Sequence, residues 1–161
     1  MPRVGLISDT HGLLRPEAIT FLRGSDFIIH AGDVGDANVL ERLESIAPIT
    51  VVRGNNDKGS WADAMAETEV LQVNDVLIYV LHDIAELDLD PVAAGFRVVV
   101  FGHSHRPLSE TRDGVLYINP GSAGPRRFKL PISVGELQVV DGSVTSKHVE
   151  LVVPSTAQQA R

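Results

Sequence analysis

The sequence contains no cysteine. This absence excludes a disulfide framework and a thiolate zinc site, so any bound metal ion must take oxygen and imidazole ligands. Aromatic residues are few as well, with five Phe, two Tyr and one Trp, which leaves little material for a platform that stacks nucleic-acid bases. The first apolar stretch, Val4 to Ile7, is far too short for a signal sequence or a membrane-spanning helix. We therefore expect a cytoplasmic protein with no membrane partner.

Positive charge is also scarce. The chain has 14 Lys and Arg against 21 Asp and Glu, a formal net charge of −7. An acidic protein is not drawn to polyanions, so strong nucleic-acid binding is not expected, and a nuclease would need a partner that supplies a basic surface. One basic cluster stands out, formed by Arg126, Arg127 and Lys129. It is either part of a solvated loop or a contact for the far side of a nucleotide.

Short apolar runs and helical segments alternate through the first half of the chain. We expect strands at 4–8, 27–30 and 49–52, with helices at 16–23 and 37–47 between them. This βαβαβ pattern predicts parallel strands.

The second half has mostly β character. After a short helix at 61–66, the turn pairs Asn74-Asp75, Asp113-Gly114 and Asp141-Gly142 each separate two apolar runs, as in hairpins. No Ser- or Gly-rich linker divides the halves. We predict a single-domain α/β fold over residues 1–153, a mixed-β sandwich of two sheets flanked by helices, with a polar, frayed tail at 154–161. The strands of the second half are expected at 69–73, 76–81, 97–101, 108–112, 115–118, 133–140 and 143–151.

Seven polar residues with the chemistry of metal ligands follow the predicted strands. A single Asp or His at a strand end is ordinarily a cap or a turn former. In α/β sheets, however, the loops beyond the carboxyl ends of the strands line the binding crevice, so these sequence-distant residues are expected to converge on one rim. Small neighbours leave room for a bulky ion. The seven candidates are Asp9, His11, Asp33, Asn55, His82, His103 and His105.

The order of these motifs resembles the calcineurin-like metallophosphoesterase superfamily. The family pattern is present as Asp9-x-His11, Gly32-Asp33, Gly54-Asn55, a lone His82 and Gly102-His103-x-His105. Asn119-Pro120-Gly121-Ser122 follows, as in the small bacterial and archaeal phosphodiesterase branch. The resemblance covers roughly the whole chain and implies the fold of that superfamily.

The resemblance also implies a centre of two divalent metal ions. Asp9, His11, Asp33 and His105 would hold the first ion, and Asp33, Asn55, His82 and His103 the second, so that Asp33 bridges them. Manganese is the expected metal, with iron, nickel, cobalt and zinc as alternatives. The expected function is a two-metal phosphoesterase, and more specifically a phosphodiesterase that hydrolyses small or activated diesters by attack of a metal-bound hydroxide.

Two positions depart from the family pattern. Asn56 stands where many members carry a histidine that protonates the leaving group, and an amide cannot act as a general acid near neutral pH. Because this catalytic position lacks a histidine, we expect the enzyme to favour diesters and substrates with a good leaving group. Asp83 replaces the glycine that commonly follows His82, and it either orients His82 or points to solvent.

Several roles stay open at this stage. Arg15 either contacts a substrate phosphate or is solvated at a helix start, and Gly121-Ser122 either cradles an anion or forms a turn. We expect His30 to be buried and hydrogen-bonded to backbone, and His148 to lie on a hairpin without a role.

The alternative function is a catalytically weak protein-binding scaffold, as in a eukaryotic trafficking-coat subunit of the same superfamily. Because every expected ligand position is filled, the enzyme is favoured. An exposed hairpin edge is compatible with a homodimer.

Overall fold

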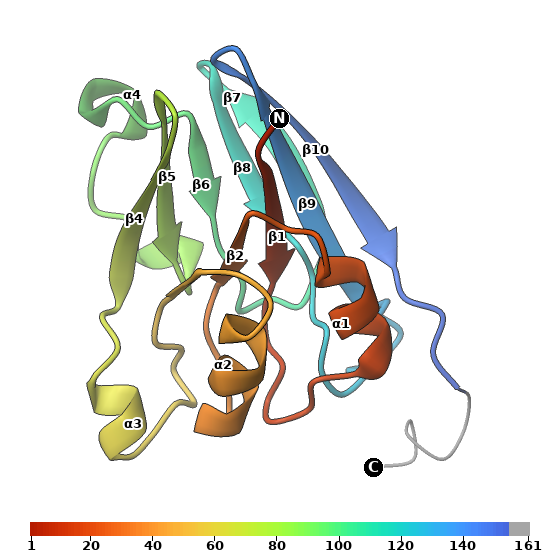
Figure 1. The fold of residues 1–161 in the computed structure, drawn as a ribbon. Coiled ribbons are helices and arrows are strands. Elements are labelled where there is room, and N and C mark those ends of the chain that lie inside the picture. The colour runs from red at the N-terminus through yellow and green to blue at the C-terminus, as the bar shows by residue number, and fades with distance from the viewer. Residues whose placement is uncertain (155–161) are drawn as a thin grey trace.

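Two five-stranded β-sheets packed face to face form the molecule (Figure 1). The computed structural model describes residues 1–154, so all but the first residue of the tail predicted at 154–161 lies outside the described residues. The strand order of the first sheet is β10 (Ser143–Glu150), β9 (Ser133–Val140), β1 (Arg3–Ile7), β2 (Phe27–His30) and β3 (Ile49–Val51). That of the second sheet is β4 (Thr68–Val73), β5 (Val76–Leu81), β6 (Val98–Val100), β8 (Val115–Asn119) and β7 (Leu108–Arg112).

Both sheets are mixed. Strands β1, β2 and β3 run parallel in the first sheet, and β5, β6 and β8 run parallel in the second. The remaining pairs are antiparallel, and they include the hairpins expected at the three turn pairs. The predicted two-sheet α/β sandwich is confirmed. The parallel pairing within the second sheet was not foreseen, because hairpin signals describe only neighbours along the chain.

Helices cover the outer faces of the sheets. Helices α1 (Pro16–Leu22) and α2 (Ala37–Glu44) pack on the first sheet through apolar residues such as Leu22 and Leu43. On the second sheet, the segment with the 3₁₀ turn η1 (Ile84–Glu86) and helix α4 (Pro91–Ala94) covers an apolar cluster that includes Tyr79 and Phe101. The short helix α3 (Ser60–Asp63) precedes β4.

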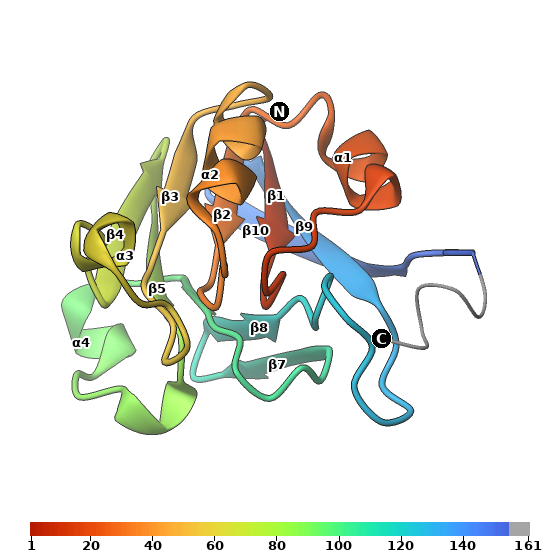
Figure 2. The ribbon, with the colours of Figure 1, turned by 90° about the horizontal axis from the view of Figure 1, so that it is seen from below.

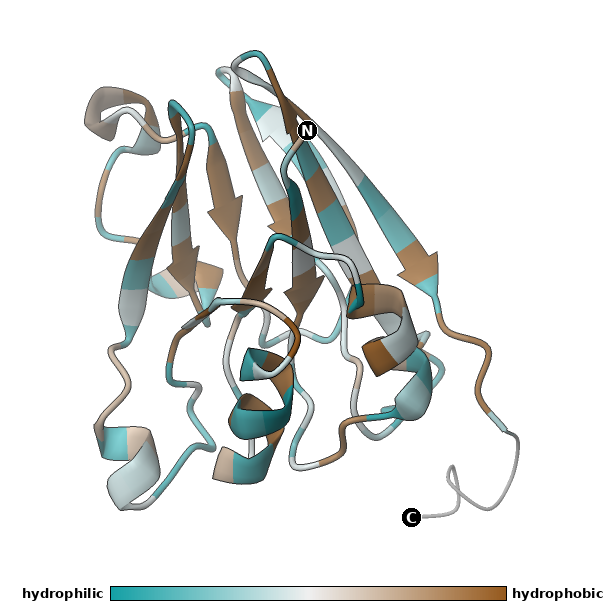
Figure 3. Ribbon diagram, viewed as in Figure 1, coloured by the Kyte–Doolittle hydropathy of each residue, from teal (hydrophilic) through white to brown (hydrophobic). Residues whose placement is uncertain are grey.

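The central core lies between the two sheets. Leu6 and Ile29 of the first sheet meet Val80 and Val100 of the second, and all four are fully buried. Figure 3 shows the corresponding brown bands along β1, β5 and β6, whereas the edge strand β10 alternates in colour. Burial of this apolar surface is the main force that holds the sheets together. The polar loops at the strand ends lie outside this core and can therefore form a site.

Element boundaries differ from the prediction at several helix ends. The second helix was expected to reach residue 47 but ends at Glu44, with Ser45 as its C-cap. Helix α3 begins before the predicted 61–66 segment, because Gly59 at φ 99° forms its start and Ala64 ends it. The short η1 and α4 were not predicted, since one turn is too short to show a helical period. No helix among residues 1–154 is long and apolar enough to cross a membrane.

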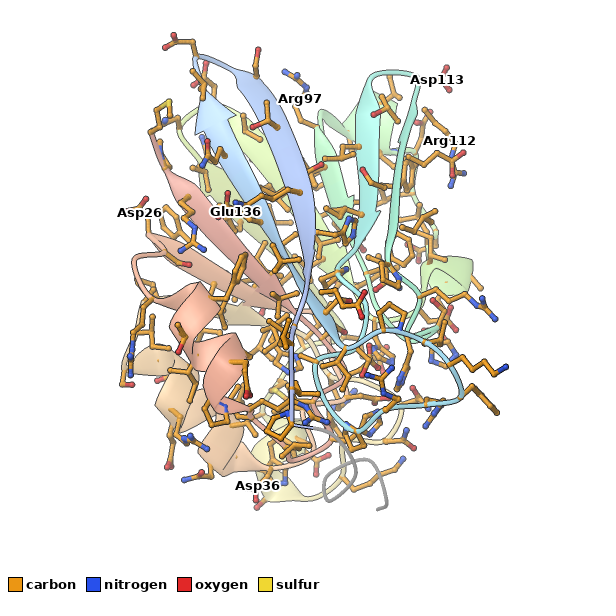
Figure 4. All side chains as sticks on the ribbon, turned by 90° about the vertical axis from the view of Figure 1, so that its right-hand side faces the viewer. Asp26, Asp36, Arg97, Arg112, Asp113 and Glu136 are labelled. Atoms are coloured by element: carbon orange, nitrogen blue, oxygen red, sulfur yellow. The ribbon has the colours of Figure 1, made fainter. Side chains whose placement is uncertain are left out.

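The two sheets are also joined by a hydrogen bond from Arg97 to the β9–β10 turn. Its Nη1 donates to the Gly142 carbonyl at 2.7 Å. Figure 4 shows Arg97 between the two sheets, at the same end as Asp113 of the β7–β8 turn and opposite Asp36 at the start of α2. The other end of the sheets carries the candidate site.

Candidate metal centre

The loops that follow five strands meet at one end of the two sheets, which faces the viewer in Figure 2. The first sheet contributes the loops after β1, β2 and β3, and the second contributes those after β5 and β6. This is the convergence that the strand-end pattern predicted. The loops carry, in this order, Asp9 and His11, Asp33, Asn55, His82, and His103 with His105.

Two overlapping groups of side chains could each hold a metal ion. Asp9, His11 and His105 form one group, and Asp9, Asp33 and His82 form the other, with the donor atoms of each group within 4.8 Å of one another. The Nε2 atom of His105 lies 3.5 Å from Asp9 Oδ1, and that of His82 lies 3.3 Å from Asp33 Oδ2. His11 Nε2 is 3.7 Å from Asp33 Oδ2 and 3.9 Å from Asp9 Oδ1, which links the groups.

Three donor atoms of these groups lack a hydrogen-bond partner among the described residues. Asp9 Oδ1, His11 Nε2 and His82 Nε2 are buried and form no hydrogen bond within residues 1–154. A buried polar atom left unpaired costs about 1–3 kcal/mol, so such atoms rarely cluster without a reason. A shared cation would satisfy them together. The oxygen and imidazole donors suit manganese, iron, cobalt, nickel or zinc, so the residues fit the divalent metal that the motifs imply.

Asn55 and His103 lie together at the open side of this centre. His103 Nδ1 is 3.2 Å from Asn55 Oδ1, and the His103 ring meets the His82 ring edge-on with centroids 5.2 Å apart. The His103 side chain is 45% exposed, unlike the buried His82. His103 lies outside the two compact groups but adjoins the one that contains His82, and Asn55 is connected to that group through His103.

Five of the seven candidate ligands have a positive φ angle. The values are 55° for Asp9, 47° for His11, 55° for Asp33, 73° for His103 and 65° for His105. Only a few per cent of non-glycine residues adopt this region, and such strain concentrates at functional sites. These backbone conformations were not predicted from the sequence.

Glycines next to the ligands allow the loops to approach one another. A Cβ atom on Gly54 would overlap the backbone N and Oδ1 of Asp33, and one on Gly102 would lie 2.7 Å from Asp9 Oδ2. The glycine before Asn55 and the one before His103 therefore allow two loops to pack closely, in addition to leaving room for an ion.

Asp57 ties two ligand loops together, a role that the sequence reasoning missed. Its buried carboxylate accepts hydrogen bonds from the backbone N–H groups of Val34 at 3.2 Å, Gly35 at 2.9 Å and Gly54 at 2.9 Å. The Asp33 loop is thereby fastened to the Asn55 loop. The available signal was its place in the Gly54–Asp57 motif, which contains no other carboxylate.

His30 has the buried structural role expected of it. Its Nδ1 accepts the N–H of Gly32 at 3.1 Å, which leaves Nε2 to donate to Thr10 Oγ1 at 3.0 Å. Thr10 in turn donates to the Val34 carbonyl at 2.8 Å. Burial lowers the pKa of His30 to about 3, so it stays neutral and joins the loops after β1 and β2.

Asn56 contacts the carboxylate that is expected to bridge the ions. Its backbone N–H donates to Asp33 Oδ1 at 2.8 Å, and its side-chain Nδ2 donates to Asp33 Oδ2 at 3.2 Å. The amide therefore orients Asp33.

His82 is oriented by the carbonyl of Ala31, and not by Asp83. His82 Nδ1 lies 2.7 Å from the Ala31 oxygen, whereas Asp83 caps η1 by accepting the N–H of Ala85 at 3.0 Å. The Asp83 carboxylate is 3.9 Å from His103 Nε2.

Arg15 is a buried side chain, and not an exposed one at the candidate centre. It is 1% exposed, and its Nη2 donates to the Gly124 carbonyl at 3.2 Å. The interpretation of Arg15 as a contact for a substrate phosphate is thus not supported, because its guanidinium lies in the interior.

The Gly121-Ser122 pair and His148 have structural contacts. The N–H of Gly121 donates to Asn119 Oδ1 at 2.8 Å, and Ser122 Oγ donates to the Asp9 carbonyl at 3.1 Å, which favours the turn over the anion cradle. His148 Nε2 donates to the Asn119 carbonyl at 2.7 Å and so links β10 to β8.

The protonation of the centre follows from burial and from close neighbours. Burial opposes ionisation of Asp33, but the adjacent His82, the N–H of Asn56 and His11 outweigh it, and the pKa of Asp33 falls below its usual range. For His82, burial is likewise outweighed by Asp33 and Asp9, which raises its pKa to about 9. Burial and then Arg127 lower the pKa of His105 to about 4. Burial raises the pKa of Asp9, although Ser8 donates a hydrogen bond to it.

A mixed two-sheet sandwich with Asp and His donors gathered at the strand ends defines a metallophosphoesterase. The family model described as the calcineurin-like phosphoesterase superfamily domain matches residues 3–142, and the chain belongs to this superfamily.

Particular relatives agree with this assignment. The chain is 34% identical over 151 residues to a probable metallophosphoesterase of Methanocaldococcus jannaschii, covering 86% of this chain and 76% of the relative. It is 28% identical over 137 residues to a phosphodiesterase of the same organism, covering 74% of this chain and 82% of the relative. Among solved structures, Vps29 of Chaetomium thermophilum matches with a TM-score of 0.76 at 18% identity, covering 96% of this chain and all of that one. At this identity the last likeness shows the fold alone.

Proposed function

We propose that the protein is a metal-dependent phosphodiesterase that acts on small or activated phosphodiesters. One observation carries the proposal: the buried, unpaired donor atoms of Asp9, His11 and His82 converge at the strand ends of both sheets. The relative named as a phosphodiesterase supports the choice of diesters over monoesters.

The seven candidates divide between two metal positions. Asp9, His11 and His105 would hold one ion, and the compact group that they form supports this assignment. Asn55, His82 and His103 would hold the other, which agrees with the contacts of His103 to both Asn55 and His82. Asp33 would serve both, since its Oδ2 lies near the Nε2 atoms of His11 and His82.

Two divalent ions, when bound, lower the pKa of a water molecule and stabilise the charge that develops in a phosphoryl displacement. The two carboxylates, Asp9 and Asp33, offset only part of the ionic charge, so the site attracts an anionic phosphodiester. Asn56 keeps Asp33 in place through its two hydrogen bonds and supplies no proton to the leaving group. Substrates with a stable leaving anion, such as aryl diesters, therefore suit this site. Manganese is the proposed metal.

The test is an assay of the manganese-reconstituted protein with bis(p-nitrophenyl) phosphate and with p-nitrophenyl phosphate. We expect metal-dependent hydrolysis and a higher kcat/KM for the diester. Asp33→Asn should reduce kcat/KM for the diester at least about a hundredfold, because it removes a carboxylate charge from the site. Asp36→Asn is the matched control, since Asp36 is an exposed cap of α2 and Asn caps a helix equally well.

The scaffold alternative is less supported, because all seven expected ligand positions are filled and their loops meet. It predicts no metal-dependent hydrolysis of either ester, a result that would contradict the proposed function. A cytoplasmic location and a homodimer stay predictions.

A further inference from the structure

A cavity of about 300 Å³ opens beside the candidate metal centre. One of its walls consists of Asn55, His82 and His103. His82 is only 6% exposed, and its Nε2 has no hydrogen-bond partner within residues 1–154. The cavity is therefore continuous with the atoms that would hold the phosphate through metal, and its size is at the lower end of small-molecule sites.

Acidic residues dominate the rest of the lining. Arg53 is the basic residue of this lining, and its Nη2 lies 2.9 Å from Glu67 Oε1, so these two charges balance. Asp83 faces His103 at 3.9 Å and caps η1. Neither Glu86 nor Asp88 forms an ion pair within the described part of the chain. Their two negative charges are left uncompensated beside the cavity.

The local fold explains why these carboxylates line the cavity. After β5, the chain begins η1 and then runs on to α4 (light green in Figure 2). Leu87 and Leu89 pack into the apolar cluster on the outer face of the second sheet, while Glu86 and Asp88 alternate with them and are exposed. The chain leaves η1 at Leu87, where the backbone becomes extended, and both acids lie on the side that lines the cavity.

We propose that this cavity receives one alcohol group of the phosphodiester, and that Glu86 and Asp88 make it selective for an alcohol that carries a positive charge. Amino alcohols and quaternary ammonium alcohols have this chemistry. The inference rests on the proposed function, because it requires the phosphate to bind at the neighbouring metal ligands. The same charges repel an anionic group, such as the next phosphate of a nucleic-acid strand.

The test compares two chromogenic diesters of the same shape. One is p-nitrophenyl phosphocholine, and the other is its uncharged isostere, 3,3-dimethylbutyl p-nitrophenyl phosphate. In each reaction water supplies the new P–O bond, the bond to p-nitrophenolate breaks, and the choline or dimethylbutyl ester stays on phosphorus. Because leaving group and shape are shared, the ratio of the two kcat/KM values measures the effect of the positive charge alone.

We expect the manganese-loaded protein to favour the choline ester about five- to tenfold, as two partly screened charges near a cation allow. Glu86→Gln/Asp88→Asn should bring the ratio close to one. Asp113→Asn/Asp141→Asn is the matched control, because it also removes two acidic charges, but at exposed hairpin turns remote from the centre (Asp113 in Figure 4). This control should keep the ratio of the wild-type protein.

A ratio near one in the wild-type protein, or a ratio that the Glu86 and Asp88 substitutions leave unchanged, would overturn the inference while the phosphodiesterase activity stands. An equal drop in the Asp113 and Asp141 control would also overturn it, since the effect would then reflect net charge. Absence of metal-dependent hydrolysis of both diesters and of bis(p-nitrophenyl) phosphate is a different outcome, and it would contradict the proposed function itself.

Discussion

Several residues of the candidate centre have strained backbone conformations, and hydrogen bonds of neighbouring residues hold them there. Positive φ angles at Asp9 and Asp33 cost of order 1–3 kcal/mol each and persist only where surrounding contacts fix them. The three hydrogen bonds to Asp57 and the chain from Gly32 through His30 to Thr10 are such contacts. The site is therefore organised by residues that would not themselves touch a metal ion.

Replacing Gly54 by Ala should weaken metal binding. The added methyl group would overlap the backbone of Asp33, so the two ligand loops must separate. We expect the Kd for manganese, measured by titration calorimetry, to rise about 10- to 100-fold, as for other supporting positions of metal sites. Gly135→Ala is the control, because its methyl group would meet only side-chain atoms, at 3.3 Å or more. Equal affinities in the two variants would contradict the role given to Gly54.

His30 should make the metal-free protein less stable in acid. Its folded pKa of about 3 lies below the ordinary value of 6.5, so the unfolded chain binds the extra proton. Stability from this group is complete above pH 6.5 and is lost by about 1.4 kcal/mol per pH unit as the pH falls from 6.5 toward 3.

The measurement is urea unfolding from pH 7 to pH 4 in the presence of a chelator. In His30→Asn, an amide oxygen can still accept the N–H of Gly32, so the free energy of unfolding should vary less steeply with pH than in the wild-type protein. Parallel curves for the two proteins would show that His30 does not cause the loss.

At the scale of elements, strand ends carry the candidate ligands, and a side chain from the sheet fixes the C-terminal end of α1. The guanidinium of Arg3 on β1 donates to the carbonyls of Phe21 at 2.6 Å and Arg23 at 3.0 Å, at the C-terminus of α1. It also pairs with Glu136 of β9, which is 5% exposed. A cation at this end of a helix is favoured by the helix dipole. Arg3 thus joins α1, β1 and β9.

Arg3→Met should lower the free energy of unfolding by about 2 kcal/mol. It removes the donors for the two carbonyls, and it leaves buried Glu136 with a hydrogen bond from Gln138 at 3.2 Å and a contact with Lys147 at 3.8 Å. Urea denaturation measures the change. Arg23→Met removes the same charge from an exposed position on that helix end, so it should cost less than about 0.5 kcal/mol. Similar losses in both variants would mean that charge, and not the contacts of Arg3, is responsible.

At the scale of the whole molecule, the candidate centre joins two sheets that otherwise meet mainly through apolar contacts. Asp9 and Asp33 extend from the first sheet, and His82 and His105 from the second. An ion held by both sets would link the sheets at the end opposite the Arg97–Gly142 hydrogen bond. Metal binding should therefore stabilise the entire fold.

Manganese at about 100 times its Kd should add about 2.7 kcal/mol to the free energy of unfolding. For a chain of this size, the Tm should rise by about 5–10 °C and fall again on addition of a chelator. Differential scanning calorimetry measures this shift. Asp36→Asn should respond like the wild-type protein and Asp33→Asn should not. A Tm indifferent to metal in the wild-type protein would contradict a centre shared by the sheets.

The sequence by itself determined the fold class and the set of candidate ligands. Hydrophobic runs, hairpin pairs such as Asp141-Gly142, and polar residues at strand ends are local signals, and each follows from the short-range chemistry of the backbone. Asp9 and Asp33 could be assigned to one rim because the carboxyl ends of parallel strands coincide.

Only the tertiary structure decided how those residues meet. The burial of Arg15, the contact of Asn56 with Asp33 and the choice of Ala31 over Asp83 as the partner of His82 all join residues distant in sequence or depend on packing. The acidic cavity next to His103 likewise exists only because loops from both sheets enclose it. Local patterns specify which groups stand at the strand ends, whereas long-range packing specifies the directions of those groups and the space that they enclose.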